Sequence, residues 1–142
     1  MFSRNRRGID LSLPKGDRGF GHLDDYGFNL TARGKGTTMT LAGSDPYQDE
    51  LRAIAESGEP VETAISPRTI QQERTDEPIV VRLFTGRRVS GPVGSVPRGL
   101  ESVVDETLRR LGDGAPGKNR IPARIVSRRG VYRVELLMGE VR

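Results

Sequence analysis

The chain has 142 residues, enough for one folded domain with an extension, and only 34% of them are hydrophobic, so not all of the chain is expected to belong to a packed core. It has no cysteine and one histidine, His22, which excludes disulfides, thiolate zinc sites and cysteine nucleophiles. The formal net charge of +4 favours anionic partners. Arginine supplies nearly all of the positive charge, which suits phosphate binding but equally follows from a GC-rich genome.

Residues 1–37 are rich in glycine and arginine and lack apolar periodicity, so we expect an N-terminal arm followed by a domain over residues 38–142. The arm holds four of the seven aromatic residues, most of them beside glycines: Phe2, Phe20, Tyr26 and Phe28. A docking arm that orders on a partner fits this composition. A disordered tail and a short hairpin at 28–31, laid on the domain, are the alternatives.

The first half of the domain predicts a strand at 39–43, a helix and a second strand at 60–66. Ser44 or Asp45 can cap the helix, Pro46 suits its first turn, and the pair at 57–58 ends it. Its apolar face comprises Tyr47, Leu51, Ile54 and Ala55. The polar stretch 67–78 is predicted to be an exposed loop.

The second half predicts a strand at 79–84, a turn at 85–87, a strand at 89–96, a helix at 99–111 and a closing hairpin. The hairpin strands are expected at 121–126 and 131–138, joined by a turn at 128–130. About six strands and two helices indicate an α+β protein, mainly β, with a small barrel or a strongly bent sheet.

No catalytic constellation is visible. Asp24 and Asp25 lie beside His22, but adjacent carboxylates on a glycine-rich segment have no enforced geometry. No Gly-Lys-Ser/Thr follows the glycines of residues 91–99, so a phosphate loop is not predicted. We expect a protein that is not an enzyme and needs no cofactor or metal. No apolar run is long enough for a transmembrane helix, and residues 1–7 lack the apolar region of a signal peptide, so we expect a cytoplasmic location.

The distribution of charge is more informative. No acidic residue occurs between Glu77 and Glu101 or between Asp113 and Glu135, and arginines accumulate in both stretches. If the two arginine-bearing turns lie on one side of the fold, they form a positive groove for a phosphate backbone. The predicted contacts are Arg82, Arg87, Arg88, Arg124, Arg128 and Arg129. Tyr47 is the candidate for base stacking, whereas Phe84 and Tyr132 are expected in the core; charged hairpin tips that only keep edges soluble are the alternative.

The order of elements resembles the HIRAN domain over residues 39–139. The matching features are Leu41-Ala42-Gly43 before the Tyr47-Gln48 pair, Gly86 before Val93-Gly94-Ser95-Val96-Pro97, the helix that follows, and the closing hairpin. The resemblance implies a modified OB-like barrel of about six strands and two helices. It also implies binding of single-stranded DNA, notably at its 3′ end, with Tyr47 as a stacking residue.

One loop departs from the family pattern. Typical members carry Asn-Pro-Tyr-Asp-x-Asn-Ala before the strand that corresponds to residues 79–84, whereas this chain has Arg74-Thr75-Asp76-Glu77-Pro78. Asp76 matches the aspartate, and the second stacking residue is missing. The leading hypothesis is a DNA-binding module whose expected ligand is single-stranded DNA. The alternative is a protein-interaction or assembly subunit, of a phage or an accessory system, whose arm docks on a neighbouring chain; the oligomeric state is not predicted.

Overall fold

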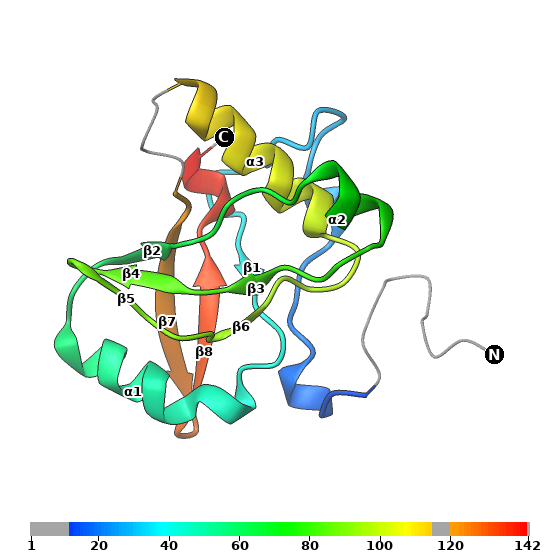
Figure 1. Cartoon of the computed structure of the whole chain (residues 1–142). Helices are drawn as coiled ribbons and strands as arrows, with labels where there is room; N and C mark the ends of the chain where they lie inside the picture. Colours follow the sequence, from blue (N-terminus) through cyan, green and yellow to red (C-terminus); the bar gives the residue numbers. More distant parts are fainter. Residues whose placement is uncertain (1–11, 115–119, 142) are drawn as a thin grey trace.

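The computed structural model describes residues 12–114 and 120–141 (Figure 1). The strands are β1 (Met39–Thr40), β2 (Val61–Thr63), β3 (Val80–Val81), β4 (Leu83–Thr85), β5 (Arg88–Val89), β6 (Gly94–Ser95), β7 (Pro122–Arg128) and β8 (Val131–Leu136). The α-helices are α1 (Gln48–Ser57), α2 (Ile70–Arg74) and α3 (Glu101–Gly114). Short 3₁₀ helices are η1 (Lys15–Asp17), η2 (Leu23–Asp25), η3 (Asp45–Tyr47) and η4 (Met138–Val141). The predicted α+β class, mainly β, is confirmed. Within the described ranges, no helix combines the length and apolar character needed to cross a membrane.

The strand count differs from the prediction because two predicted strands each change partner along their length. The strand predicted at 79–84 divides at Arg82 into β3, which pairs with β6, and β4, which pairs with β2 and β5. The strand predicted at 89–96 likewise divides into β5 and β6. Pro92 lies in that gap and has no N–H to donate to a ladder.

All the strand pairs of the described chain are antiparallel. Six strands form one sheet in the order β1-β8-β7-β2-β4-β5, and β3 and β6 form a second pair. Ala42, two residues after β1, makes an isolated bridge to Ser95 of β6. Its N–H donates to the Ser95 carbonyl at 2.8 Å, and the Ser95 N–H returns a bond of 2.7 Å, so β1 is continuous with the second pair.

The helices lie at opposite ends of the strands, with α1 beside the β7–β8 hairpin and α3 at the other end (Figure 1). Leu51 and Ile54 of α1 and Val103, Val104 and Leu108 of α3 are buried in one core with residues of the strands. The predicted helices are confirmed, although α1 begins only after the η3 turn. The Ser44 hydroxyl does not cap it but donates to the Val93 carbonyl at 2.8 Å.

The closing hairpin is confirmed with a two-residue turn. Arg129 and Gly130 have φ values of 56° and 79°, both positive, as a type I′ turn requires. Val134 and Leu136 are buried, whereas Arg133 and Glu135 point to the other face of β8. The hairpin therefore presents one apolar and one charged face.

The prediction of an exposed loop at 67–78 is wrong in part. Ile70–Arg74 form α2, whose start is a capping box between Thr69 and Gln72, and the Arg68 side chain before it is buried. The Thr-x-x-Gln spacing was visible in the sequence. The short polar helix itself has no apolar face from which to predict it.

Residues 12–37 pack against the rest of the chain, while the first eleven residues of the expected arm, Phe2 among them, lie outside the described residues. Tyr26 and Ala32 are buried in the core and form an antiparallel bridge. The Gly27 N–H donates to the Thr31 carbonyl at 2.7 Å, closing a tight turn. For these residues the arrangement is the hairpin laid on the domain, one of the three alternatives.

Candidate nucleic-acid interface

The seven predicted contact residues occupy separate parts of the fold. Arg87 and Arg88 lie at the β4–β5 turn, and Arg128 and Arg129 at the β7–β8 tip. Arg82 lies between β3 and β4, Arg124 in β7, and Tyr47 at the end of η3. All six arginines are exposed, and Tyr47 is half-buried.

The two arginine-bearing turns are not brought together. Val61 of β2 pairs with Thr85 on one side and with Ala123 on the other, so β2 lies between the β4–β5 turn and the beginning of β7. The β7–β8 tip is five residues further along, a rise of about 16 Å. Helix α1 hydrogen-bonds residues that follow each of the two turns. Gln48 hydrogen-bonds the backbone of Tyr132, and Glu50 accepts from the Gly91 N–H.

Five of the predicted arginines share one property. In the described part of the chain, no hydrogen bond or ion pair engages the side chain of Arg82, Arg87, Arg88, Arg128 or Arg129. Their guanidinium groups keep all of their donors for solvent or a ligand. Arg124 differs, because its Nε lies 2.7 Å from Glu135 Oε1.

The candidate aromatic residues are also separated. Phe84 is not in the core as expected but half-exposed on the sheet, with the Arg120 guanidinium 3.9 Å from its ring centroid. Phe84 is paired with Glu62 and Val89, whose side chains share that outer face. Tyr132 is partly buried against the core, as expected. The described groove beside the hairpin-tip arginines is lined by neither Phe84 nor Tyr47.

A groove of about 700 Å³ adjoins the charged face of the β7–β8 hairpin. Arg128, Arg129, Val126 and Val131 line it from the hairpin, and Thr38 and Thr40 from the segment of β1. Gly16, Gly19 and Phe20 line it from the N-terminal segment, and Leu41, Arg133 and Glu135 complete its lining. The volume falls within the range typical of small-ligand sites.

Phe20 is presented to this groove by a fixed backbone. Its N–H and carbonyl bond the carbonyl and N–H of Thr40 at 3.0 and 2.8 Å, which adds one residue to the edge of the sheet. Gly19 has a φ of 77°, and a Cβ there would lie 2.8 Å from the Thr40 carbonyl. A Cβ on Gly21 would lie 2.7 Å from Leu100 Cδ1. The glycines beside Phe20 therefore permit close approach, whereas the sequence alone indicated flexibility.

Asp17 anchors this segment, and the sequence gives no sign of it. Its side chain is 1% exposed and accepts the N–H groups of Ser44 and Asp45 at 2.7 and 2.9 Å. Arg133 lies 2.6 Å from the same carboxylate and 2.8 Å from Asp45. These partners are 27, 28 and 116 residues away in the chain, so no local pattern connects them.

The electrostatics of the groove follow from these pairs. Arg133 is neutralised by Asp17 and Asp45, and Glu135 by Arg124. Among the described residues that line the groove, Arg128 and Arg129 remain as the uncompensated charges. The groove is therefore cationic at the hairpin tip and carries an exposed aromatic ring on its opposite wall.

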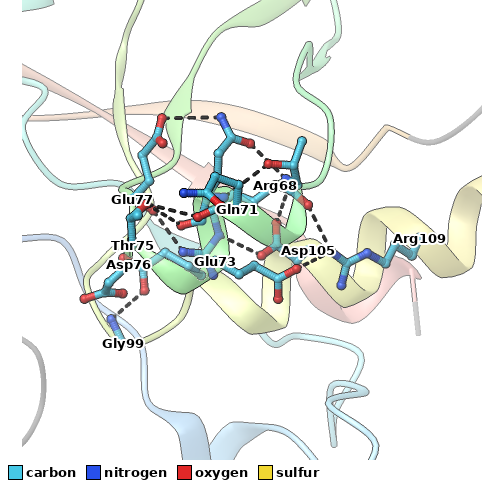
Figure 2. A network of polar contacts seen from close by, with 12 residues as sticks. Arg68, Gln71, Glu73, Thr75, Asp76, Glu77, Gly99, Asp105 and Arg109 are labelled. Carbon is cyan, nitrogen blue, oxygen red and sulfur yellow. Dashed lines mark hydrogen bonds and ion pairs between the residues drawn. The ribbon is translucent and has the colours of Figure 1, made fainter.

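A second polar network connects the loop after β2 with α2 and α3 (Figure 2). Asp105 is fully buried and accepts both the backbone N–H and the Nε of Arg68 at 2.8 Å. Arg68 also donates to the Glu77 carbonyl, and Arg109 bridges the Arg68 carbonyl and Glu73. These contacts fix the loop in which the resemblance to HIRAN domains places a binding motif. Asp76 of that loop is held by Arg98, 2.7 Å from its carboxylate.

In the described ranges, no group of three or more histidine and acidic side chains could hold a metal ion. The chain matches no known family model, no curated protein and no solved structure.

Proposed function

We propose that the chain is a non-catalytic nucleic-acid-binding module whose ligand is single-stranded DNA. The observation that carries the proposal is a set of exposed arginines that have no partner among residues 12–114 and 120–141: Arg82, Arg87, Arg88, Arg128 and Arg129. Elsewhere in the described chain, arginines such as Arg68, Arg98 and Arg133 are bound by carboxylates. A free guanidinium fork suits a phosphate group, which it can bind through two parallel hydrogen bonds.

Three further features support this function. The chain has a net charge of +4. Both clusters of free arginines lie in the acid-free stretches of the sequence, so a phosphate backbone would meet little local repulsion. Among the described residues, the arginines of the β7–β8 tip line a groove together with an exposed aromatic ring, which favours an unpaired strand whose bases are accessible.

We also propose a HIRAN-like, OB-like barrel for residues 39–139. The order of the elements supports it, as does the Ala42–Ser95 bridge that links the sheet containing β1 to the β3–β6 pair. Recognition of a strand end is not part of the proposal. The loop at 74–78 lacks the aromatic residue of the family, and its Asp76 is engaged by Arg98.

A titration of labelled single-stranded and duplex DNA, followed by fluorescence anisotropy over a range of salt, tests the function. We expect binding to the single strand that weakens steeply with salt, with a slope of about −0.7 for each phosphate neutralised. Absence of binding to either DNA at low salt would contradict the proposal. A preference for the duplex would retain nucleic-acid binding but exclude the single strand as the main ligand.

The second candidate function is assembly on a protein partner, and Phe28 is the observation that favours it. The ring is fully exposed at the tip of the turn at 27–31, and Leu23 nearby in the chain is 56% exposed. Arg110 of α3 donates to the Asn29 carbonyl at 3.1 Å and steadies the turn. Light scattering of the wild-type protein and of Phe28→Ser tests the case in which the partner is a second copy of the chain. A wild-type oligomer that dissociates in the variant supports assembly, whereas finding both proteins monomeric contradicts it.

A further inference from the structure

We propose that Phe20 is a base-stacking platform and that its groove binds a short stretch of a single strand. A base lies on the Phe20 ring, and a phosphate of the same stretch lies at Arg128 and Arg129. This inference rests on the proposed function and adds to it a position and an aromatic residue that neither the sequence nor the family resemblance indicates.

The Phe20 ring is exposed although its backbone is held in place. Its ring is 62% exposed, although the backbone on both sides is fixed by the two bonds to Thr40 and by the buried Asp17 nearby. An apolar ring left in water gains free energy when a flat partner covers it. Because the backbone is already ordered, covering this ring requires little further loss of conformational entropy.

The orientation of the Phe20 ring also favours stacking. The rings of Phe20 and His22 meet edge to face, with centroids 5.0 Å apart and planes at 86°. In such a contact His22 covers at most one face of the Phe20 ring, and the residue is 62% exposed. Since every base has a π-face, the other face can take part in sequence-independent stacking.

The groove that contains Phe20 also carries positive charge that complements a phosphate. Arg128 and Arg129 line the same groove as Phe20, and no carboxylate of the described part of the chain binds them. Arg133 and Glu135, which also line the groove, are each paired with a group of opposite charge. The groove thus offers a stacking surface and an anion site together, which matches the bases and phosphates of a short single strand.

The chain has no tryptophan, so Phe20→Trp creates a single fluorescent reporter at the proposed platform. Phe28→Trp is the matched control, because Phe28 is even more exposed in the same segment but lies outside the groove. We expect oligothymidylate to quench the fluorescence of the Phe20→Trp protein and to leave that of Phe28→Trp unchanged. Equal quenching in both proteins, or none in Phe20→Trp at a concentration that saturates anisotropy, would overturn the inference.

Affinity measurements provide an independent test. Phe20→Ala should weaken binding of oligothymidylate about tenfold without changing the salt slope, whereas Phe28→Ala should have no effect. On an abasic oligonucleotide, which has phosphates but no bases, Phe20→Ala should have no effect either. Unchanged melting temperatures confirm that the variants are folded.

The outcomes separate this inference from the proposed function. If substitution of Arg128 and Arg129 weakens binding but Phe20→Ala does not, the stacking site is wrong and nucleic-acid binding remains. If the wild-type protein binds no DNA, both are wrong. Thymidine monophosphate added in place of the strand distinguishes the two sources of a nucleotide: quenching by the monomer at comparable concentration would assign the groove to free nucleotides instead.

Discussion

The corner formed by α2 and α3 and the tip of the β7–β8 hairpin use arginine in opposite ways. At the corner, Arg68 is bound by Asp105 at 2.8 Å, Arg109 by Glu73 at 2.9 Å and Arg98 by Asp76 at 2.7 Å. At the tip, Arg128 and Arg129 have no partner among the described residues. The same side chain therefore contributes to folding in one region and stays available in the other.

The acidic residues determine this difference. Glu101 and Asp105 lie within α3, and Glu73 and Asp76 lie in and just after α2, where the fold places them against arginines. The stretch between Asp113 and Glu135 contains no acid, so the hairpin has no local carboxylate for its tip. Substitutions at the corner should consequently change stability, and substitutions at the tip should change binding.

The largest effect is expected for Asp105→Ala. Removal of this carboxylate leaves the buried Arg68 guanidinium without its main partner, which should cost about 3–5 kcal/mol of the free energy of unfolding. Urea denaturation measures the loss. A matched variant, Arg68→Met/Asp105→Leu, removes both charges and should recover part of the stability. The comparison fails if Asp105→Ala weakens DNA binding of the folded protein but not its stability.

A smaller loss is expected for Asp17→Ala, which releases the segment that carries Phe20. The carboxylate accepts two backbone N–H groups and an ion pair in a buried position, so we expect a loss of about 2–3 kcal/mol in urea denaturation. Glu56→Ala, which removes an exposed acid from α1, is the control and should change stability little. Equal stability of the two variants would show that Asp17 is not an anchor.

Because Tyr26, in the same segment, is buried, we expect the protein to lose stability at alkaline pH. Burial, with a smaller contribution from the charge of Asp25, raises the pKa of Tyr26 from 10.0 to about 12. The unfolded state therefore loses its phenolic proton first, and the stabilisation is complete below pH 10 and is lost as the pH rises towards 12. Relative to Tyr26→Phe, the wild-type protein should lose about 2 kcal/mol over this window. Parallel pH profiles in urea denaturation would contradict this.

The smallest effect on stability is expected for Arg129→Asn, which changes a residue of the hairpin tip itself. Arg129 has a φ of 56°, which asparagine tolerates better in a type I′ turn. We expect a gain of about 0.5 kcal/mol together with weaker DNA binding. If Arg129 is retained at a strained position because its charge binds DNA, its replacement should raise stability and lower DNA affinity together. A variant that is more stable and binds equally well would remove Arg129 from the interface.

Elements with a strong local signal could be predicted from the sequence. The apolar periods of α1 and α3 and the alternation in β8 each determine one buried face, and the arginine–glycine turn determines the hairpin. The division at Arg82 could not be predicted, because it depends on which strands lie opposite each half. Helix α2 has a capping box but no apolar face, so the sequence pattern predicts a loop there.

The candidate site was predictable only in part. The exposed arginines followed from charge distribution, but their separation into two turns depends on the register of β2 with β4 and β7. The Arg68–Asp105 pair spans 37 residues and the Asp17–Arg133 pair 116, beyond the reach of any periodic pattern. Phe20 was noted as an aromatic residue of the arm, and its place opposite the hairpin tip depends on the anchor at Asp17.

The most direct test of the account compares the salt dependence of single-strand binding in two double variants with equal loss of charge. Arg128→Ala/Arg129→Ala removes the tip. Arg52→Ala/Lys35→Ala removes one cation from α1 and one from beside Gly139, past the opposite end of β8. We predict that the tip variant alone binds weakly, that its slope of log affinity against log salt is smaller by about one to two, and that both variants unfold like the wild-type protein. Equal slopes for the two variants would contradict the claim that the unpaired arginines of the hairpin tip bind the phosphates.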